Sequence, residues 1–141
     1  WSPSSISYTG NNRTHMIRVP DPGRFELRLM DGSVNPYLLQ AGVMAAGLDG
    51  INNKIDPGEP IFCNMYTDYK NYPNLPKLPD ELEDSLNNLE DSKVLREAFG
   101  EKVISSYVKL KKQELESFDK EERFDKRSSI TAWEKINTLD C

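Results

Sequence analysis

Short runs of β-branched and aromatic residues open the chain. They occupy 6–8, 16–19 and 25–29 and are separated by two turn-forming stretches, Gly10-Asn11-Asn12 and Pro20-Asp21-Pro22-Gly23. Runs of this length, bounded by Gly, Pro and Asn, are typical of strands. The pattern predicts three short antiparallel strands, of which the last two form a hairpin.

An apolar segment follows at 36–50. Asn35 and Pro36 suit the N-cap and the first turn of a helix, and residues 37–48 are apolar or small on nearly every side. A helix that is apolar all round is usually buried, so we expect a buried helix here. The next segment, 55–78, is rich in proline and has no regular period, which predicts a long loop lying over another part of the molecule.

The rest of the chain has helical periodicity. Leu82, Leu86 and Leu89 recur at helical spacing behind an acidic first turn, which predicts a surface helix. A further helix is expected over 101–118, and a short one around Trp133. The apolar stripe of the 101–118 helix consists of Ile104, Tyr107, Val108, Leu115 and Phe118. Strands followed by helices predict an α+β fold.

Composition narrows the class of protein. The 141 residues are 37% hydrophobic and 29% charged, which suits one compact domain with one core. No apolar run approaches the roughly 20 residues of a membrane span, so no membrane association is expected. A net charge of -5 has the wrong sign for binding nucleic acid over the whole surface.

The ends and the cysteines of the chain add two expectations. Cys63 and Cys141 form neither a disulfide framework nor a metal-binding spacing, which favours a reducing, cytoplasmic location. Because the chain begins at Trp1 and has no signal-peptide pattern, we expect a fragment of something longer.

The candidate chemistry lies on the predicted hairpin. Successive side chains of a strand point to opposite faces, so Arg24, Glu26 and Arg28 should share one face. The alternating apolar residues should face the core, namely Phe25, Leu27 and Leu29. The neighbouring segment adds Arg13 and Arg18, and the hairpin is expected to bring Arg18 beside Arg24. Four arginines would then converge on one glutamate.

Two interpretations of this cluster stay open. Cross-strand ion pairs on a solvated strand face are common and contribute about 0–1 kcal/mol each. However, all four cations are arginine, whose planar guanidinium holds phosphate or carboxylate in two-point contacts. Excess positive charge also repels itself unless an anion binds. The second interpretation is therefore a phosphate site in which Glu26 is free to hold a divalent cation.

Six motifs resemble, in order, the C-terminal part of the glutamine synthetase family. They are Asn12-Arg13, Arg18-Val19-Pro20, 24–28 (Arg-Phe-Glu-Leu-Arg), 35–38 (Asn-Pro-Tyr-Leu), 46–51 (Ala-Gly-Leu-Asp-Gly-Ile) and 56–60 (Asp-Pro-Gly-Glu-Pro). The resemblance is close over 1–60 and looser to about Phe118. It implies part of a catalytic domain that ligates glutamate to ammonia or an amine, with ATP and Mg²⁺ or Mn²⁺. In that reaction the γ-carboxylate first takes the terminal phosphoryl of ATP.

The same resemblance implies a role for each residue of the cluster. Glu26 corresponds to a glutamate ligand of the metal at the nucleotide phosphates. Arg13 corresponds to a catalytic arginine that contacts both the transferred phosphoryl of ATP and the glutamate substrate. Arg28 corresponds to a catalytic arginine that binds glutamate, and Arg18 and Arg24 to arginines near the ATP phosphates. Phosphoryl transfer needs positioning and charge neutralisation more than covalent help, which agrees with such a cluster.

Several residues depart from the pattern of the bacterial ammonia-using members. The loop between Arg18 and Arg24 is shorter. The segment 64–66 (Asn-Met-Tyr) resembles a loop whose tyrosine is adenylylated in some bacterial relatives, but residues 67–70 do not continue that pattern, which predicts that Tyr66 is an ordinary loop tyrosine. The single histidine, His15, is predicted to be a hydrogen-bonded structural residue. The tail at 130–134 resembles the branch that joins glutamate to organic amines such as methylamine.

The resemblance also implies that the other metal ligands lie upstream of Trp1 and that the whole protein forms homo-oligomeric rings in the cytoplasm. The amine acceptor stays open. A rival hypothesis is a non-catalytic relative that keeps the fold for assembly or regulation, which an intact arginine cluster disfavours. Another is an unrelated acidic α+β phosphate-binding module, which the absence of a glycine-rich phosphate loop disfavours.

Overall fold

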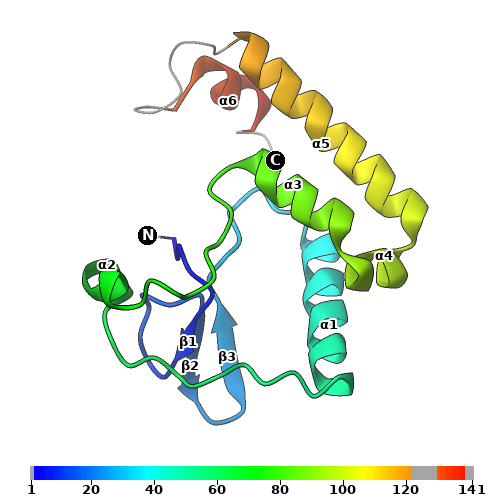
Figure 1. The fold of residues 1–141 in the computed structure, drawn as a ribbon. Helices are drawn as coiled ribbons and strands as arrows, with labels where there is room; N and C mark the ends of the chain where they lie inside the picture. The colour runs from blue at the N-terminus through cyan, green and yellow to red at the C-terminus, as the bar shows by residue number, and fades with distance from the viewer. Residues whose placement is uncertain (1, 122–129, 139–141) are drawn as a thin grey trace. The chain divides into compact units, whose positions relative to one another are not determined.

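The computed structural model describes residues 2–121 and 130–138, so Cys141 lies outside the described residues. Three strands precede the helices, which confirms the α+β class (Figure 1). The elements are β1 (Tyr8–Thr9), β2 (Ile17–Asp21), β3 (Arg24–Leu27), α1 (Pro36–Asn52), α2 (Met65–Asp68), the 3-10 helix η1 (Tyr69–Asn71), α3 (Leu82–Asp91), α4 (Lys93–Phe99), α5 (Glu101–Glu121) and α6 (Ala132–Asn137).

The chain divides into two compact units. The first combines 1–32 with 55–80 and carries the sheet, α2 and η1, whereas the second combines 33–54 with 81–141 and carries the other helices. Composition predicts one core shared by the whole chain. Among the described residues, the packed apolar core belongs to the second unit alone. The buried side chains of the first unit are mostly polar, namely Ser7, Thr9 and His15 beside Met65.

The sheet has the order β1-β2-β3. As predicted, β2 and β3 form an antiparallel hairpin, and its turn uses Gly23 at a φ of +77°, a conformation that favours glycine. The prediction that all strands are antiparallel is wrong, because β1 pairs with β2 in parallel, with Tyr8 opposite Ile17. Residues 10–16 connect the end of β1 to the start of β2, which lies beside the start of β1. The pattern of hydrophobic residues does not predict this crossover.

A β-bulge sets the register of the hairpin. Arg18 pairs with Glu26, and Asp21 pairs with Arg24, so β2 has one residue more than β3 between these pairs. Pro20 lies within this interval and has no N–H to donate, which suits an interrupted ladder. The bulge decides which side chains of β2 and β3 face each other.

The segment 55–78 lies over β1 and the residues before it, as predicted. The Ile61 amide donates to the Tyr8 carbonyl at 3.0 Å, and the Ile6 amide donates to the Pro76 carbonyl at 2.9 Å. The segment is not wholly irregular, because it contains α2 and η1. Asn64 caps α2 by accepting from the Tyr66 amide at 3.0 Å, a local signal that the loop prediction missed.

The second unit is built on α3 and α5, which lie side by side (Figure 1). Leu86, Ile104 and Val108 form its buried core, which confirms the predicted apolar positions. The short helix α4, not predicted from the sequence, starts at the Ser92 cap and ends at Gly100, whose φ is +83°.

The tail helix α6 confirms the prediction around Trp133. Thr131 begins it with a capping box that includes Glu134. The Trp133 ring meets Phe118 edge to face, with centroids 5.6 Å apart, and its indole N–H donates to Ser117 at 3.0 Å. These contacts fasten α6 to α5.

The predicted burial of α1 is wrong for the described chain. Its start is as expected, since the Asn35 side chain accepts from the Tyr37 amide at 3.0 Å. However, Met44 and Ile51 are 65% and 74% exposed, because the helix packs against α4 and little else covers it within its unit. Neither α1 nor any other described helix has the length and hydropathy that a membrane-crossing segment needs.

Candidate functional site

The hairpin brings three of the predicted site residues together. Arg18 on β2 faces Glu26 on β3, and its Nη1 lies 2.7 Å from Oε2 of the carboxylate. Arg28, just beyond β3, places its Nη1 3.0 Å from the other oxygen, Oε1. Each oxygen of Glu26 therefore accepts from one guanidinium.

Both of these arginines are held firmly. Arg18 also donates through Nε to the Asn11 side chain at 2.9 Å, so its guanidinium plane is fixed from two sides. The Arg18 and Arg28 side chains are mostly buried. Within the described part of the chain, the Nε of Arg28 is buried and has no acceptor. A buried N–H without an acceptor is costly, so the geometry of Arg28 comes at the expense of hairpin stability.

The electrostatics follow from this geometry. The hydrogen bond from Arg18 lowers the pKa of Glu26 below its usual 4.5, desolvation opposes that change, and Arg28 lowers the pKa further. Glu26 is therefore a carboxylate at neutral pH. Both of its oxygens accept hydrogen bonds from arginine, as the predicted cluster of guanidiniums around Glu26 requires.

Arg13 and Arg24 lie apart from this ion-pair cluster. Arg24 is exposed and sits opposite Asp21 at the hairpin turn, whereas Arg13 is exposed in the turn between β1 and β2. Neither forms an ion pair with Glu26, so the predicted convergence of four arginines on it is wrong. Arg18 faces Glu26, whereas Arg24 pairs with Asp21 at the turn, so the prediction that Arg18 lies beside Arg24 is also wrong.

The opposite face of β3 also differs from the prediction. Phe25 and Leu29 were expected to face a core, but they are 61% and 43% exposed, and Leu27 is half-buried. The described residues do not supply a layer that covers this face.

His15 is buried and fully hydrogen-bonded, as predicted. Its Nε2 lies 3.0 Å from the Cys63 carbonyl, and its Nδ1 lies 3.1 Å from the Ser7 hydroxyl. A carbonyl can only accept, so Nε2 carries the proton and the hydroxyl donates to Nδ1 in the neutral ring. His15 thus joins the residue before β1, the 10–16 turn and the 55–78 segment.

Comparison with known proteins assigns the family. Residues 1–134 match the model of the glutamine synthetase catalytic domain. The chain belongs to this family.

Its relatives include glutamine synthetases and a glutamate–methylamine ligase. The chain is 48% identical over 140 residues to a glutamine synthetase of Rhizobium meliloti, covering 99% of this chain and 30% of the relative. It is 44% identical over 118 residues to a glutamate–methylamine ligase of Methyloversatilis universalis, covering 81% and 26%. A solved GmaS/ADP complex superposes with a TM-score of 0.80 at 42% identity, covering all of this chain and 30% of the other. The chain thus spans about a third of the length of these relatives.

The described residues supply only part of a site for a divalent cation. Among the described residues no group of three or more His, Cys, Asp or Glu side chains could hold a metal ion. Glu26 is a single carboxylate, but an ionised carboxylate offers about four lone-pair sites, so two guanidinium contacts leave room for another ligand. Mg²⁺ is often held by one or two carboxylates plus substrate phosphates, and Glu26 suits one such position.

Two tyrosines of the 55–78 segment carry no part of the cluster. Tyr66, predicted to be a loop residue, lies in the first turn of α2. The neighbouring Cys63 raises the pKa of the Tyr72 phenol above its usual value of 10.0, so Tyr72 is protonated at neutral pH.

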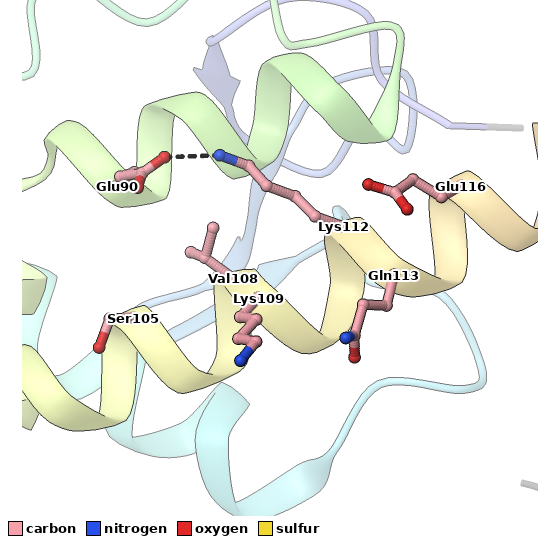
Figure 2. Close-up of a pocket in the computed structure, with 7 residues that line it drawn as sticks. All are labelled: Glu90, Ser105, Val108, Lys109, Lys112, Gln113 and Glu116. Carbon is pink, nitrogen blue, oxygen red and sulfur yellow. Dashed lines mark hydrogen bonds and ion pairs between the residues drawn. The ribbon is translucent and has the colours of Figure 1, made fainter.

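A separate open hollow lies on the second unit, between α3 and α5 (Figure 2). Figure 2 shows Lys112 reaching across to Glu90, with Nζ 2.8 Å from Oε2. This contact lowers the pKa of Glu90. Two lysines and two glutamates line the hollow, so its lining carries no net positive charge for an anion, and none of the predicted site residues lines it.

Proposed function

We propose that the whole protein is an ATP-dependent ligase that joins glutamate to ammonia or a small organic amine. The observation that carries this proposal is the Arg18–Glu26–Arg28 arrangement in a chain of the glutamine synthetase family. Two guanidiniums and one carboxylate on one hairpin form a compact set of groups for phosphates and their counter-ion. The relatives include both a glutamine synthetase and a glutamate–methylamine ligase, which supports either choice of amine.

The proposed reaction has two steps. An oxygen of the glutamate γ-carboxylate forms a bond to the terminal phosphorus of ATP while the bond from that phosphorus to ADP breaks. The amine nitrogen then bonds to the γ-carbonyl carbon, phosphate leaves, and the nitrogen loses a proton. Negative charge moves between oxygens throughout, so fixed guanidiniums stabilise both steps without acting as nucleophiles.

Each of the five predicted site residues has a role in this proposal. Arg18 and Arg24 bind the nucleotide phosphates, Arg13 contacts both the transferred phosphoryl and glutamate, and Arg28 binds the glutamate substrate. Glu26 supplies one oxygen ligand to Mg²⁺ or Mn²⁺, which would neutralise phosphate charge when bound.

The proposal extends to the setting of the enzyme. The family resemblance and the absence of a cysteine framework favour a cytoplasmic enzyme of nitrogen metabolism that forms homo-oligomeric rings. The chain contributes only part of the site, because the described residues hold one carboxylate of the cluster and no complete metal site.

A second candidate is a non-catalytic relative that keeps the fold for assembly. One observation favours it: the charges of Glu26 are already satisfied by Arg18 and Arg28 without any ligand. In that case the cluster would serve only the stability of the hairpin.

Turnover distinguishes the two candidates. The intact protein should release phosphate from ATP only when glutamate and an amine are both present, and ammonia and methylamine should be compared at equal concentration. The isolated 141-residue chain is the matched control and should be inactive. An intact, folded protein that shows no glutamate-dependent turnover with either amine would overturn the ligase and favour the assembly protein.

A further inference from the structure

Two distant segments of the first unit are joined around Arg13. The Asn12 side chain donates through Nδ2 to the Cys63 carbonyl at 2.8 Å, and the Met65 amide donates to the Thr14 hydroxyl at 3.0 Å. The residues on either side of Arg13 are therefore fixed to the segment 63–65.

The turn that contains Arg13 is also closed on itself. Oδ1 of Asn12 accepts from the Thr14 amide at 3.0 Å and from the Thr14 hydroxyl at 2.9 Å. An Asn side chain that accepts from the amide two residues later forms an Asx turn, which restricts the backbone of the residue between them. Here the residue between them is Arg13.

The chain after Arg13 is anchored as well. His15 is 1% exposed and donates to the same Cys63 carbonyl that accepts from Asn12. One carbonyl oxygen has two lone pairs and can accept both hydrogen bonds. The turn thus has little freedom to move away from the 63–65 segment.

The Arg13 side chain itself has no such support. It is exposed, and within 2–121 and 130–138 its guanidinium forms no hydrogen bond or ion pair, unlike those of Arg18 and Arg28. Its location therefore depends on its backbone. We infer that Asn12 and Thr14 are positioning residues, which hold the Arg13 guanidinium where it meets the anionic substrate. This inference rests on the proposed ligase function.

Thr14→Val in the intact enzyme tests this role. Valine keeps the shape of threonine but neither accepts from Met65 nor donates to Asn12. We expect kcat/KM for glutamate to fall about tenfold, because a small misplacement of a substrate-binding group is costly. Thr14→Ser keeps the hydroxyl and should restore kcat/KM to within about twofold. Thr67→Val is the matched control, because it removes an exposed hydroxyl of α2 that bonds only within 64–68, and it should change kcat/KM less than about twofold.

A double-mutant cycle with Arg13→Ala separates positioning from general stability. If Thr14 acts through Arg13, Thr14→Val should cost less than about twofold in the Arg13→Ala background, measured with radiolabelled ATP to reach low rates. If Thr14→Val fails to fold, Asn12→Ala takes its place in the same cycle. A tenfold loss in both backgrounds, or an equal loss in Thr67→Val, overturns the positioning role and leaves the ligase standing. Absence of turnover in the wild-type enzyme overturns the proposed function and this inference with it.

Discussion

The Arg18 guanidinium and the Glu26 carboxylate face each other across the β2–β3 hairpin, with Nη1 2.7 Å from Oε2. The same contact fits a structural ion pair and a preformed phosphate site. Substitutions that preserve shape but change charge or hydrogen-bond geometry distinguish the two.

Glu26→Gln in the intact enzyme keeps the size of the side chain and removes its charge. We expect turnover to fall about 100-fold or more and the Mg²⁺ or Mn²⁺ concentration for half-maximal rate to rise, because an amide is a poor ligand for a hard cation. The melting temperature should change by only a few degrees. Steady-state rates over a metal titration, with thermal unfolding alongside, measure both.

The control for Glu26→Gln is Glu90→Gln, which also removes a carboxylate from an ion pair, with Lys112 on the second unit. It should leave the metal dependence unchanged. If both variants keep the wild-type metal dependence, the assignment of Glu26 as a ligand is wrong and the ion-pair interpretation holds.

Arginine-to-lysine changes should separate the two substrates. Lysine keeps the positive charge but loses the two-point contact of the guanidinium. Arg28→Lys is expected to raise KM for glutamate about tenfold with little effect on ATP, and Arg18→Lys to raise KM for ATP. Arg96→Lys, in an ion pair with Glu101 in the second unit, is the control and should change neither constant. Equal effects of Arg18→Lys and Arg28→Lys on both substrates would contradict the separate roles.

The stability of the 141-residue chain should depend on Glu26 only above its folded-state pKa. The pKa of Glu26 is lowered from 4.5, first by the hydrogen bond from Arg18, so the folded state binds its proton less readily than the unfolded state. Such a group adds stability above the unfolded-state pKa, and this stability is lost as pH falls through the folded-state pKa. The gap in melting temperature between wild type and Glu26→Gln should therefore be largest near about pH 6 and close as the pH falls below 4.5. A gap that stays constant over this range would show that the carboxylate charge does not stabilise the hairpin.

The exposed face of α1 should bind apolar dyes and promote self-association of the isolated chain. Met44, Leu48 and Ile51 share one face of the helix at helical spacing, and all three are exposed. Ile51→Gln should lower dye fluorescence and shift the sedimentation of the chain towards the monomer. Ile136→Gln is the matched control, because Ile136 on α6 is 75% exposed against 74% for Ile51 but is outside this face. Equal effects of the two substitutions would argue against α1 as the associating surface.

The sequence alone determines the local elements and the chemistry they carry. The Asn35 cap, the apolar stripe of α5 and the turn at Gly23 depend on residues a few positions apart, so periodicity and turn chemistry predict them. The ordered motifs also place Arg18, Glu26 and Arg28 near each other, because a hairpin joins neighbouring strands.

Tertiary structure decides what depends on contacts between distant segments. The parallel direction of β1 and the bulge between Arg18 and Asp21 are set by backbone hydrogen bonds, which a pattern of side chains does not specify. The bonds from Asn12 and His15 to the Cys63 carbonyl join residues 51 and 48 positions apart, and neither sequence segment signals the other. The exposure of α1 has the same origin, because an apolar sequence favours burial, but a helix is buried only where other residues cover it.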